Sequence, residues 1–342
     1  MITCAVGAES AVKESAFQEG WRLAFSRPGF VTLKHEENHS PPNGVFVRTS
    51  SRSIGSARNS SFEALAEKIT SLLSSHPDCV RPFDQLHVWP KDRTAIGKFG
   101  FEPGPDEVSE AISQEVFPYL QRDWLKCDQP NRIAESGDRV LDLVLVEPSH
   151  WFLGWHQSSD WHSRWPGGVQ PMTPKDEPIS RAYYKAAESI TWSGFPMRPG
   201  DTAVEIGSAP GGACGRLLEL GMRVIGIDPA EMDSRITENP NYNHIQARAG
   251  DLPRKVFRGA KWLLVDSNVA PQKTLTTLRN IVLNRQCTLE GLLVTLKIGN
   301  YESANQITAW RNEVESWNPH RVRVRQLSRN KVEVCFAISF QR

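Results

Sequence analysis

The chain has 342 residues, 39% of them hydrophobic and 23% charged, a composition typical of globular proteins with about two domains. Its apolar runs fall short of the roughly 18 to 20 residues of a membrane span, and its first residues lack the basic region and apolar core of a secretory signal. Six scattered cysteines without a C-x-x-C pair predict reduced thiols in a cytoplasmic protein. The net charge of +1 argues mildly against a large nucleic-acid footprint, so any contact with RNA must come from local patches.

The first 157 residues alternate short helical and strand patterns without a catalytic constellation. Residues 1–75 predict a small α/β unit with short strands at 22–26, 31–35 and 45–49. It ends in a helix at 61–73, announced by a capping box from Ser60 to Glu63. Residues 76–157 predict a second mixed unit. Its expected elements are a strand at 86–89, a helix at 107–126 interrupted at Pro118, and strands at 140–146 and 151–156.

A segment rich in Pro, Gly and Ser, residues 158–178, predicts a linker that leads into a C-terminal domain at 179–342. Trp161, Arg164 and Trp165 lie close together in it, and aromatic rings beside arginine can stack on unpaired bases. Tryptophans that pin the linker to a domain surface are the simpler interpretation. We expect no metal site, because His87 and His150 are more typical of ordinary polar positions than of metal ligands.

The stretch 202–228 organises the C-terminal domain. An apolar strand at 202–206 is followed by a glycine-rich turn at 207–212, a helical pattern, and a second strand at 224–227 that ends on Asp228. This order predicts one half of a doubly wound nucleotide-type site, in which the acid accepts hydrogen bonds from ribose hydroxyls. An ordinary strand-to-helix turn is the alternative.

The spacing of the glycines indicates which ligand this turn binds. It reads G-x-x-x-G-G, which is neither the G-x-G-x-x-G of dinucleotide-binding proteins nor the G-K-[ST] of a P-loop. Glu205, just before the turn, would repel a phosphate but would suit a ligand with a positive amino group, such as S-adenosylmethionine. The expected cofactor-binding residues are Glu205, Gly207, Ser208, Ala209, Pro210, Gly211, Gly212, Asp228, Asp251 and Asp266.

The rest of the C-terminal domain alternates strands and helices, which predicts an α/β fold with a mostly parallel sheet. The last two strands, 321–327 and 331–340, are joined too tightly for a crossover, so the closing strand must be antiparallel. This arrangement is the usual Rossmann-like shape of a S-adenosylmethionine-dependent methyltransferase domain.

Charged residues fall at positions of this sheet where burial is costly. Asp266 and Lys297 end two apolar strands at the carboxyl edge, where open α/β sheets bind ligands. Glu333 follows the turn of the last two strands, which the topology brings to the same edge. Lys185, on the helix before the first strand, supplies a fourth charged group.

A Lys–Asp–Lys–Glu set suits methyl transfer to a hydroxyl group. A lysine is a poor base at neutral pH unless burial or a second ammonium lowers its pKa, and flanking carboxylates hold the amine in place. We therefore expect Lys297 to act as the general base, Asp266 to orient it, and Lys185 and Glu333 to complete the network. A purely structural buried ion pair is the alternative.

Other methyl-transfer chemistries leave marks that this chain lacks. Amine methylation of bases usually shows [DN]-P-P-[YF] at the position where this chain has Asp266-Ser267-Asn268-Val269. Carbon methylation of pyrimidines needs a cysteine nucleophile, and none of the six lies near a strand's carboxyl end in a Pro-Cys context.

These residues resemble a known family. The chain is similar to the FtsJ-type ribose 2′-O-methyltransferases, whose catalytic set is Lys–Asp–Lys–Glu in this order. The matching positions are Ser180-Arg181-Ala182-x-x-Lys185, the turn 207–212, Asp266, Lys297 and Glu333. Residues 20–32, with the run Ala24-Phe25-Ser26-Arg27-Pro28-Gly29-Phe30, resemble the ribosomal RNA large-subunit methyltransferase M family.

The resemblance implies a ferredoxin-like region at 1–75, a THUMP-like RNA-binding region at 76–157 and an FtsJ-like catalytic domain. It also implies S-adenosylmethionine as cofactor and 2′-O-methylation of a cytidine in 23S ribosomal RNA, or in its assembly intermediate. Two positions depart from the family pattern, since Glu205 replaces an aspartate and Ala213 replaces an aromatic residue.

Three rival functions remain open on the sequence. The chain could 2′-O-methylate another RNA, such as transfer RNA. It could be a non-catalytic RNA-binding assembly factor built on the same fold, although such a protein has no physical reason to keep Lys297. A nucleotide-dependent oxidoreductase is disfavoured by the spacing of the glycine turn. A further RNA-contact candidate is the basic cluster Arg321, Arg323, Arg325, Arg329 and Lys331, for which a solvated strand face is an equal alternative.

Overall fold

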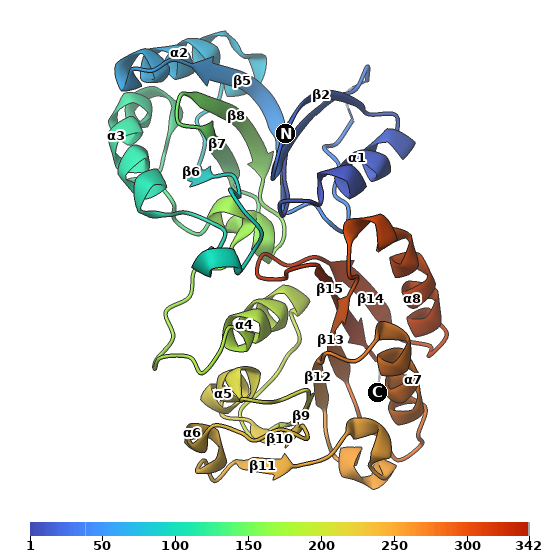
Figure 1. Cartoon of the computed structure of the whole chain (residues 1–342). Coiled ribbons are helices and arrows are strands. Elements are labelled where there is room, and N and C mark those ends of the chain that lie inside the picture. Colours follow the sequence, from blue (N-terminus) through green and yellow to red (C-terminus); the bar gives the residue numbers. More distant parts are fainter. Residues whose placement is uncertain (38, 341–342) are drawn as a thin grey trace. The chain divides into compact units, whose positions relative to one another are not determined.

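The computed structural model describes residues 1–37 and 39–340, which form two units, Met1–Pro171 and Met172–Arg342 (Figure 1). Each unit has its own hydrophobic core. In the described part of the chain, no helix combines the length and the apolar character needed to cross a membrane.

The N-terminal unit contains two four-stranded sheets. The first is antiparallel, has the order β2–β3–β1–β4, and carries α1 (Glu9–Gln18). Its strands are β1 (Ile2–Thr3), β2 (Arg22–Arg27), β3 (Phe30–Lys34) and β4 (Thr49–Ser50). The second has the order β5–β8–β7–β6, with β6 and β7 parallel. Its strands are β5 (Arg52–Arg58), β6 (Gln85–Pro90), β7 (Arg139–Glu147) and β8 (His150–Gln157).

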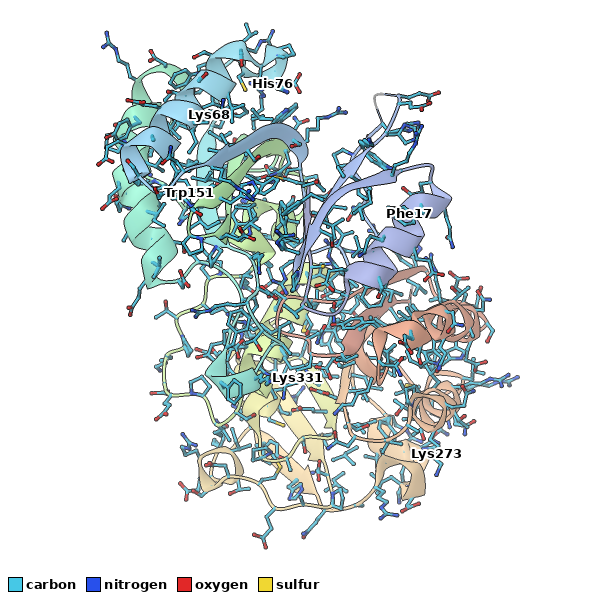
Figure 2. The ribbon with its side chains drawn as sticks, turned by 45° about the horizontal axis from the view of Figure 1, so that its top comes forward. Phe17, Lys68, His76, Trp151, Lys273 and Lys331 are labelled. Atoms are coloured by element: carbon cyan, nitrogen blue, oxygen red, sulfur yellow. The ribbon has the colours of Figure 1, made fainter. Side chains whose placement is uncertain are left out.

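Helices α2 (Phe62–Ser75) and α3 (Glu107–Trp124) pack on the second sheet through apolar side chains, while the 3-10 turns η1 (Pro77–Cys79) and η2 (Lys98–Gly100) connect its elements. Figure 2 labels Lys68, which is exposed on α2, and Trp151 of β8, which is buried in this core. Strand β5 is part of this sheet and α2 packs on it, so the boundary between the two sheets lies near residue 50. The sequence had predicted a boundary at residue 75.

Three local expectations in this unit were wrong. The helix α2 is capped by Ser61, whose Oγ accepts a hydrogen bond from the amide of Ala64 at 3.4 Å, and not by Ser60. Helix α3 continues through Pro118, because Val116, Phe117 and Leu120 around it are buried in the core and outweigh one lost backbone hydrogen bond. The strand expected at 45–49 is largely a turn.

The expected linker is partly ordered within the N-terminal unit. Two 3-10 turns, η3 (Trp161–Arg164) and η4 (Pro166–Gly168), follow β8. Trp165 is buried at 3% exposure, as in the simpler interpretation of the linker tryptophans. Trp161 stays exposed, with the guanidinium of Arg164 lying 4.3 Å from its ring centroid.

The C-terminal unit is built on a seven-stranded sheet with the order β11–β10–β9–β12–β13–β15–β14. Its first five strands in this order are parallel, and β15 pairs antiparallel with both neighbours. The strands are β9 (Thr202–Ile206), β10 (Arg223–Ile227), β11 (Tyr242–Ile245), β12 (Trp262–Asp266), β13 (Gly291–Lys297), β14 (Arg321–Arg325) and β15 (Glu333–Ser339). The expected fold class, a Rossmann-like methyltransferase sheet with an antiparallel last strand, is confirmed.

Helices cover both faces of this sheet (Figure 1). The helices are α4 (Ala182–Ser193), α5 (Gly212–Glu219), α6 (Ser234–Thr237), α7 (Pro271–Val282) and α8 (Gln306–Glu315), with 3-10 turns η5 (Ala249–Asp251), η6 (Arg254–Phe257) and η7 (Tyr301–Asn305). Side chains of α4, α5 and α6 share one core cluster, and α7 packs against α8. The central strands β12 and β13 are nearly all apolar because both of their faces are covered.

Candidate active site

Three of the four charged residues expected at the sheet edge form one connected cluster. The ammonium of Lys185, on α4, lies 2.6 Å from Oδ2 of Asp266 at the end of β12 and 2.6 Å from Oε1 of Glu333 at the start of β15. The fourth, Lys297, is the last residue of β13 and stands directly opposite Glu333 in the antiparallel pair. Four elements that are far apart in the sequence therefore deliver two lysines and two carboxylates to the carboxyl edge.

Lys185 is the less exposed lysine of this site, with a side chain that is 14% exposed. Burial alone would lower the pKa of its ammonium, but the charges and hydrogen bonds of Asp266 and Glu333 outweigh burial and the net shift is upward. Burial would likewise raise the pKa of Glu333, and the positive charges of Lys185 and Lys297 turn the net shift downward. Lys185 is therefore held as a cation, which suits a fixed positive charge and not a general base.

Lys297 differs from the expectation that it is buried. Its side chain is exposed, because β13 ends at this residue and the preceding Leu296 takes the inward position. Its ammonium donates a hydrogen bond to Oδ1 of Asn268, two residues beyond Asp266. Asn268 was missed at the sequence level, although its place directly after the end of β12 is a signal for the ligand-binding edge.

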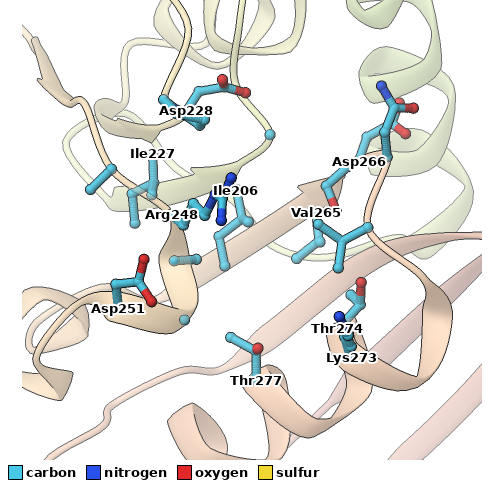
Figure 3. A pocket seen from close by; sticks show the side chains of 18 of the residues that line it. Ile206, Ile227, Asp228, Arg248, Asp251, Val265, Asp266, Lys273, Thr274 and Thr277 are labelled. Atoms are coloured by element: carbon cyan, nitrogen blue, oxygen red, sulfur yellow. The ribbon is translucent and has the colours of Figure 1, made fainter.

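A cavity of about 520 Å³ opens beside this cluster, between the ends of β9, β10 and β12 and the start of α7 (Figure 3). Of the expected cofactor-binding residues, those that line it are Gly207, Ala209, Asp228, Asp251 and Asp266. Those that are not part of its lining are Glu205, Ser208, Pro210, Gly211 and Gly212. The sequence did not indicate Arg248, whose side chain points into the cavity, nor the α7 residues Lys273, Thr274 and Thr277.

The glycines of the turn serve backbone packing as much as ligand approach. Gly207 has φ +84°, and a Cβ there would collide with the carbonyl oxygen of Asp266. A Cβ on Gly212 would collide with Oγ of Ser180 and lie 3.0 Å from the amide nitrogen of Tyr183. Gly207 thus lets β9 and β12 end close together, and Gly212 lets α5 pack tightly against α4.

The two acids that flank the turn have different surroundings. Asp228 holds the loops around the cavity, since Oδ2 accepts from the amide of Ala209 at 3.3 Å and Oδ1 from that of Ala230 at 2.8 Å. Glu205 is buried at 2% exposure, and its Oε2 has no hydrogen-bond partner among the described residues. Burial raises the pKa of Glu205 to about 8, so the carboxyl is largely neutral at pH 7.

The basic cluster near the C-terminus does not form one surface. Arg325 is buried, and Arg323 lies over the ring of Trp192, with its guanidinium donating to the Trp192 carbonyl at 2.9 Å. Arg321 is exposed at the opposite end of β14. Arg329 and Lys331 belong to the turn between β14 and β15 at the carboxyl edge, and Lys331, labelled in Figure 2, is exposed. In the described residues, no group of three or more His, Cys, Asp or Glu side chains is placed to hold a metal ion.

No family model matches the chain. A ribosomal RNA large subunit methyltransferase M of Idiomarina loihiensis is 20% identical over 302 residues, which cover 85% of this chain and 78% of that protein. The protein of the same name from Laribacter hongkongensis is 32% identical over 228 residues, or 64% of this chain and 59% of the relative.

The chain is thus similar to proteins named ribosomal RNA large subunit methyltransferase M. The resemblance expected from the sequence is therefore confirmed, and the matches with the Thauera, Azoarcus and Laribacter relatives cover 57% to 59% of those proteins. Solved structures that are similar include a fibrillarin pre-rRNA processing protein of Methanococcus jannaschii, at 11% identity and TM-score 0.38, which covers 61% of this chain and 91% of that one. Another is a Burkholderia thailandensis N1-methyltransferase with bound S-adenosylhomocysteine, at 14% identity, TM-score 0.34, and coverage of 48% and 80%. The fold assignment rests on the strand order of the sheet itself.

Proposed function

We propose that this protein is an S-adenosylmethionine-dependent RNA 2′-O-methyltransferase, and that its target is a cytidine of 23S large-subunit ribosomal RNA. The observation that carries the proposal is Lys185 bridging Asp266 and Glu333, with Lys297 opposite Glu333, at the carboxyl edge beside the cavity. The names of the relatives support ribosomal RNA as the substrate class.

S-adenosylmethionine is the methyl donor of this enzyme class, and the cavity residues fit it. The volume of about 520 Å³ is that of a small-molecule site. Apolar walls from Ile206, Ile227 and Val265 suit an adenine ring, and Asp228 and Asp251 offer acceptors for ribose and amino groups. The role of Glu205 toward the amino group of the donor stays a prediction, because Glu205 does not line this cavity.

The four charged residues divide the work of hydroxyl activation. When bound, the cofactor supplies an electrophilic methyl group on a positively charged sulfur. Lys185 stays protonated and fixes both carboxylates, as its raised pKa indicates. Lys297 would take the proton of the ribose 2′-hydroxyl, and the hydroxyl oxygen would then receive the methyl group that the bound donor supplies.

The N-terminal unit is proposed to position RNA. Residues 76–157, expected to be THUMP-like, supply three strands of its second sheet. The exposed Trp161, with the guanidinium of Arg164 over its ring, provides a surface on which an unpaired base can stack. The proposed catalytic residues all lie in the C-terminal unit. The N-terminal unit thus binds RNA, and the C-terminal unit transfers the methyl group.

The test is to identify the methylated product. Purified protein with methyl-labelled S-adenosylmethionine is given large-subunit ribosomal RNA from a deletion strain, as protein-free RNA and as assembly intermediates, and transfer RNA in parallel. We expect label in a 2′-O-methylcytidine of the ribosomal RNA. Label in transfer RNA alone would move the substrate to that class. Absence of transfer to every RNA would favour a non-catalytic assembly factor.

A further inference from the structure

A buried carboxylate fixes the turn that carries two of the basic residues. Glu188, one helical turn after Lys185 on α4, is 1% exposed. Its Oε1 accepts hydrogen bonds from the amide of Ser328 at 2.8 Å and from the Ser328 hydroxyl at 2.6 Å, and its Oε2 accepts from the amide of Arg329 at 3.1 Å. An ionised group in the core is costly unless it is satisfied, and these three bonds satisfy it.

The turn is also closed from within. The side chain of Asn330, itself 2% exposed, accepts from the amide of Leu327 at 2.9 Å, and the Asn330 amide donates to the Leu327 carbonyl at 3.0 Å. The side-chain Nε2 of Gln326 donates to the carbonyl of Lys331. The segment 326–331 is thus held at both ends and at its tip, which is unusual for a surface connection between two strands.

This rigid turn orients one side chain in particular. The guanidinium of Arg329 lies 4.9 Å from the ring centroid of Tyr184, which directly precedes Lys185 on α4. A guanidinium that lies on an aromatic ring has lost much of its freedom and keeps its planar set of donors in a fixed direction. The same helix therefore carries Tyr184 against Arg329, Lys185 against the two carboxylates, and Glu188 against the turn.

We propose that Arg329 binds a phosphate of the RNA backbone beside the target ribose, and that Glu188 is the residue that positions it. The inference rests on the proposed function and deepens it, because it assigns a contact with the RNA backbone to the turn packed against α4. Arginine is suited to this role since its planar donors match two oxygens of one phosphate, and such contacts fix the register of a nucleic acid on a protein without reading its sequence.

The experiment measures RNA affinity of the full chain as a function of salt, with a fragment of large-subunit ribosomal RNA as the probe. Loss of one phosphate contact reduces the slope of log affinity against log salt by about 0.7 to 0.9. We expect this reduction in Arg329→Ala, with the KM for RNA raised roughly tenfold and S-adenosylmethionine affinity unchanged. Arg329→Lys should recover the slope but only part of the affinity, because lysine keeps the charge without the planar donors.

The matched control is Arg321→Ala, which removes the same charge from an exposed position at the opposite end of β14. We expect its salt slope to match that of the wild type. Glu188→Gln should raise the KM for RNA without changing the salt slope, since Arg329 remains but is less well placed. If that variant unfolds, Ser328→Ala, which removes one of the three hydrogen bonds to Glu188, replaces it as the test.

The outcomes separate this inference from the proposed function. If the wild type transfers the methyl group, but Arg329→Ala has the same salt slope and the same KM for RNA as the wild type, the inference about Arg329 is overturned and the proposed function is not. An Arg329-dependent salt slope in a protein that transfers no methyl group to RNA would support the contact and refute the enzyme. A wild-type protein that does not bind the RNA would refute both.

Discussion

The two lysines of the site lie in contrasting surroundings. Lys185 is largely shielded from solvent, bridges Asp266 and Glu333 at 2.6 Å each, and has a raised pKa. Lys297 is exposed at the end of β13 and donates a hydrogen bond to Oδ1 of Asn268. Two lysines at one sheet edge therefore differ in their state. Lys185 with Asp266 and Glu333, here called the fixed half, is already paired in the free protein. Lys297 with Asn268, here called the open half, is exposed, and we propose that the substrate covers it.

Removing the fixed half should have the largest effect. Lys185→Ala leaves Asp266 and Glu333 without their shared cation, and loss of one partner in this partly exposed network costs about 1–3 kcal/mol. We expect a clear fall in the midpoint of chemical denaturation together with loss of methyl transfer. An Ala variant as stable as the wild type would show that the ion pairs do not hold the edge together.

Glu205, the buried carboxyl just before the glycine turn at 207–212, gives a prediction of similar size for the dependence of stability on pH. Burial raises the pKa of Glu205 from 4.5 to about 8, so the folded protein binds a proton that the unfolded chain has released between these values. Stability should therefore fall as pH rises from about 4.5 to 8 and level off above, by on the order of a few kcal/mol from this group. In Glu205→Gln this part of the fall should disappear. Denaturation of both proteins between pH 5 and 8.5 measures their free energies of unfolding. An equal decrease with pH in Glu205→Gln and in the wild type would contradict the prediction.

A smaller effect is expected on the open side. Asn268→Ala removes the acceptor of the Lys297 ammonium, a single exposed hydrogen bond worth about 1 kcal/mol. We expect methyl transfer to slow by roughly three- to tenfold, with unfolding unchanged within about 0.5 kcal/mol. Asn268→Asp, which keeps an acceptor, is the matched control. A stability loss as large as that of Lys185→Ala would place Asn268 in the fixed half.

Much of the site could be predicted from the sequence because topology constrains it. Charged residues at the ends of apolar strands, as at Asp266 and Lys297, and a short final hairpin were enough to predict Glu333 at the same edge, and the structure puts it directly opposite Lys297. The burial of each side chain was not predictable. Lys185 extends from α4 to the carboxylates of Asp266 and Glu333, whereas Lys297 ends β13 in an exposed position, and the sequence pattern does not show this difference.

The same limit explains the other differences. Glycines in a turn predict backbone dihedral angles that other residues rarely adopt. The packing of Gly212 against α4 could not be predicted, because it depends on Ser180 and Tyr183, about 30 positions earlier. The division between the N-terminal sheets was misplaced because β5 pairs with β8, nearly 100 residues later, and local patterns do not show such pairings. Glu188 was missed because an acid on a helix is usually solvated, and only the turn at 326–331 makes it a buried acceptor.

The most direct measurement is single-turnover methyl transfer to ribosomal RNA by Lys297→Ala, with S-adenosylmethionine affinity and thermal unfolding measured on the same preparation. We predict a rate lower by about 10²- to 10⁴-fold with cofactor affinity and unfolding close to the wild type, because an exposed general base is lost while the fixed half stays intact. Methyl transfer at the full rate with cofactor binding preserved would contradict the assignment of Lys297 as the base.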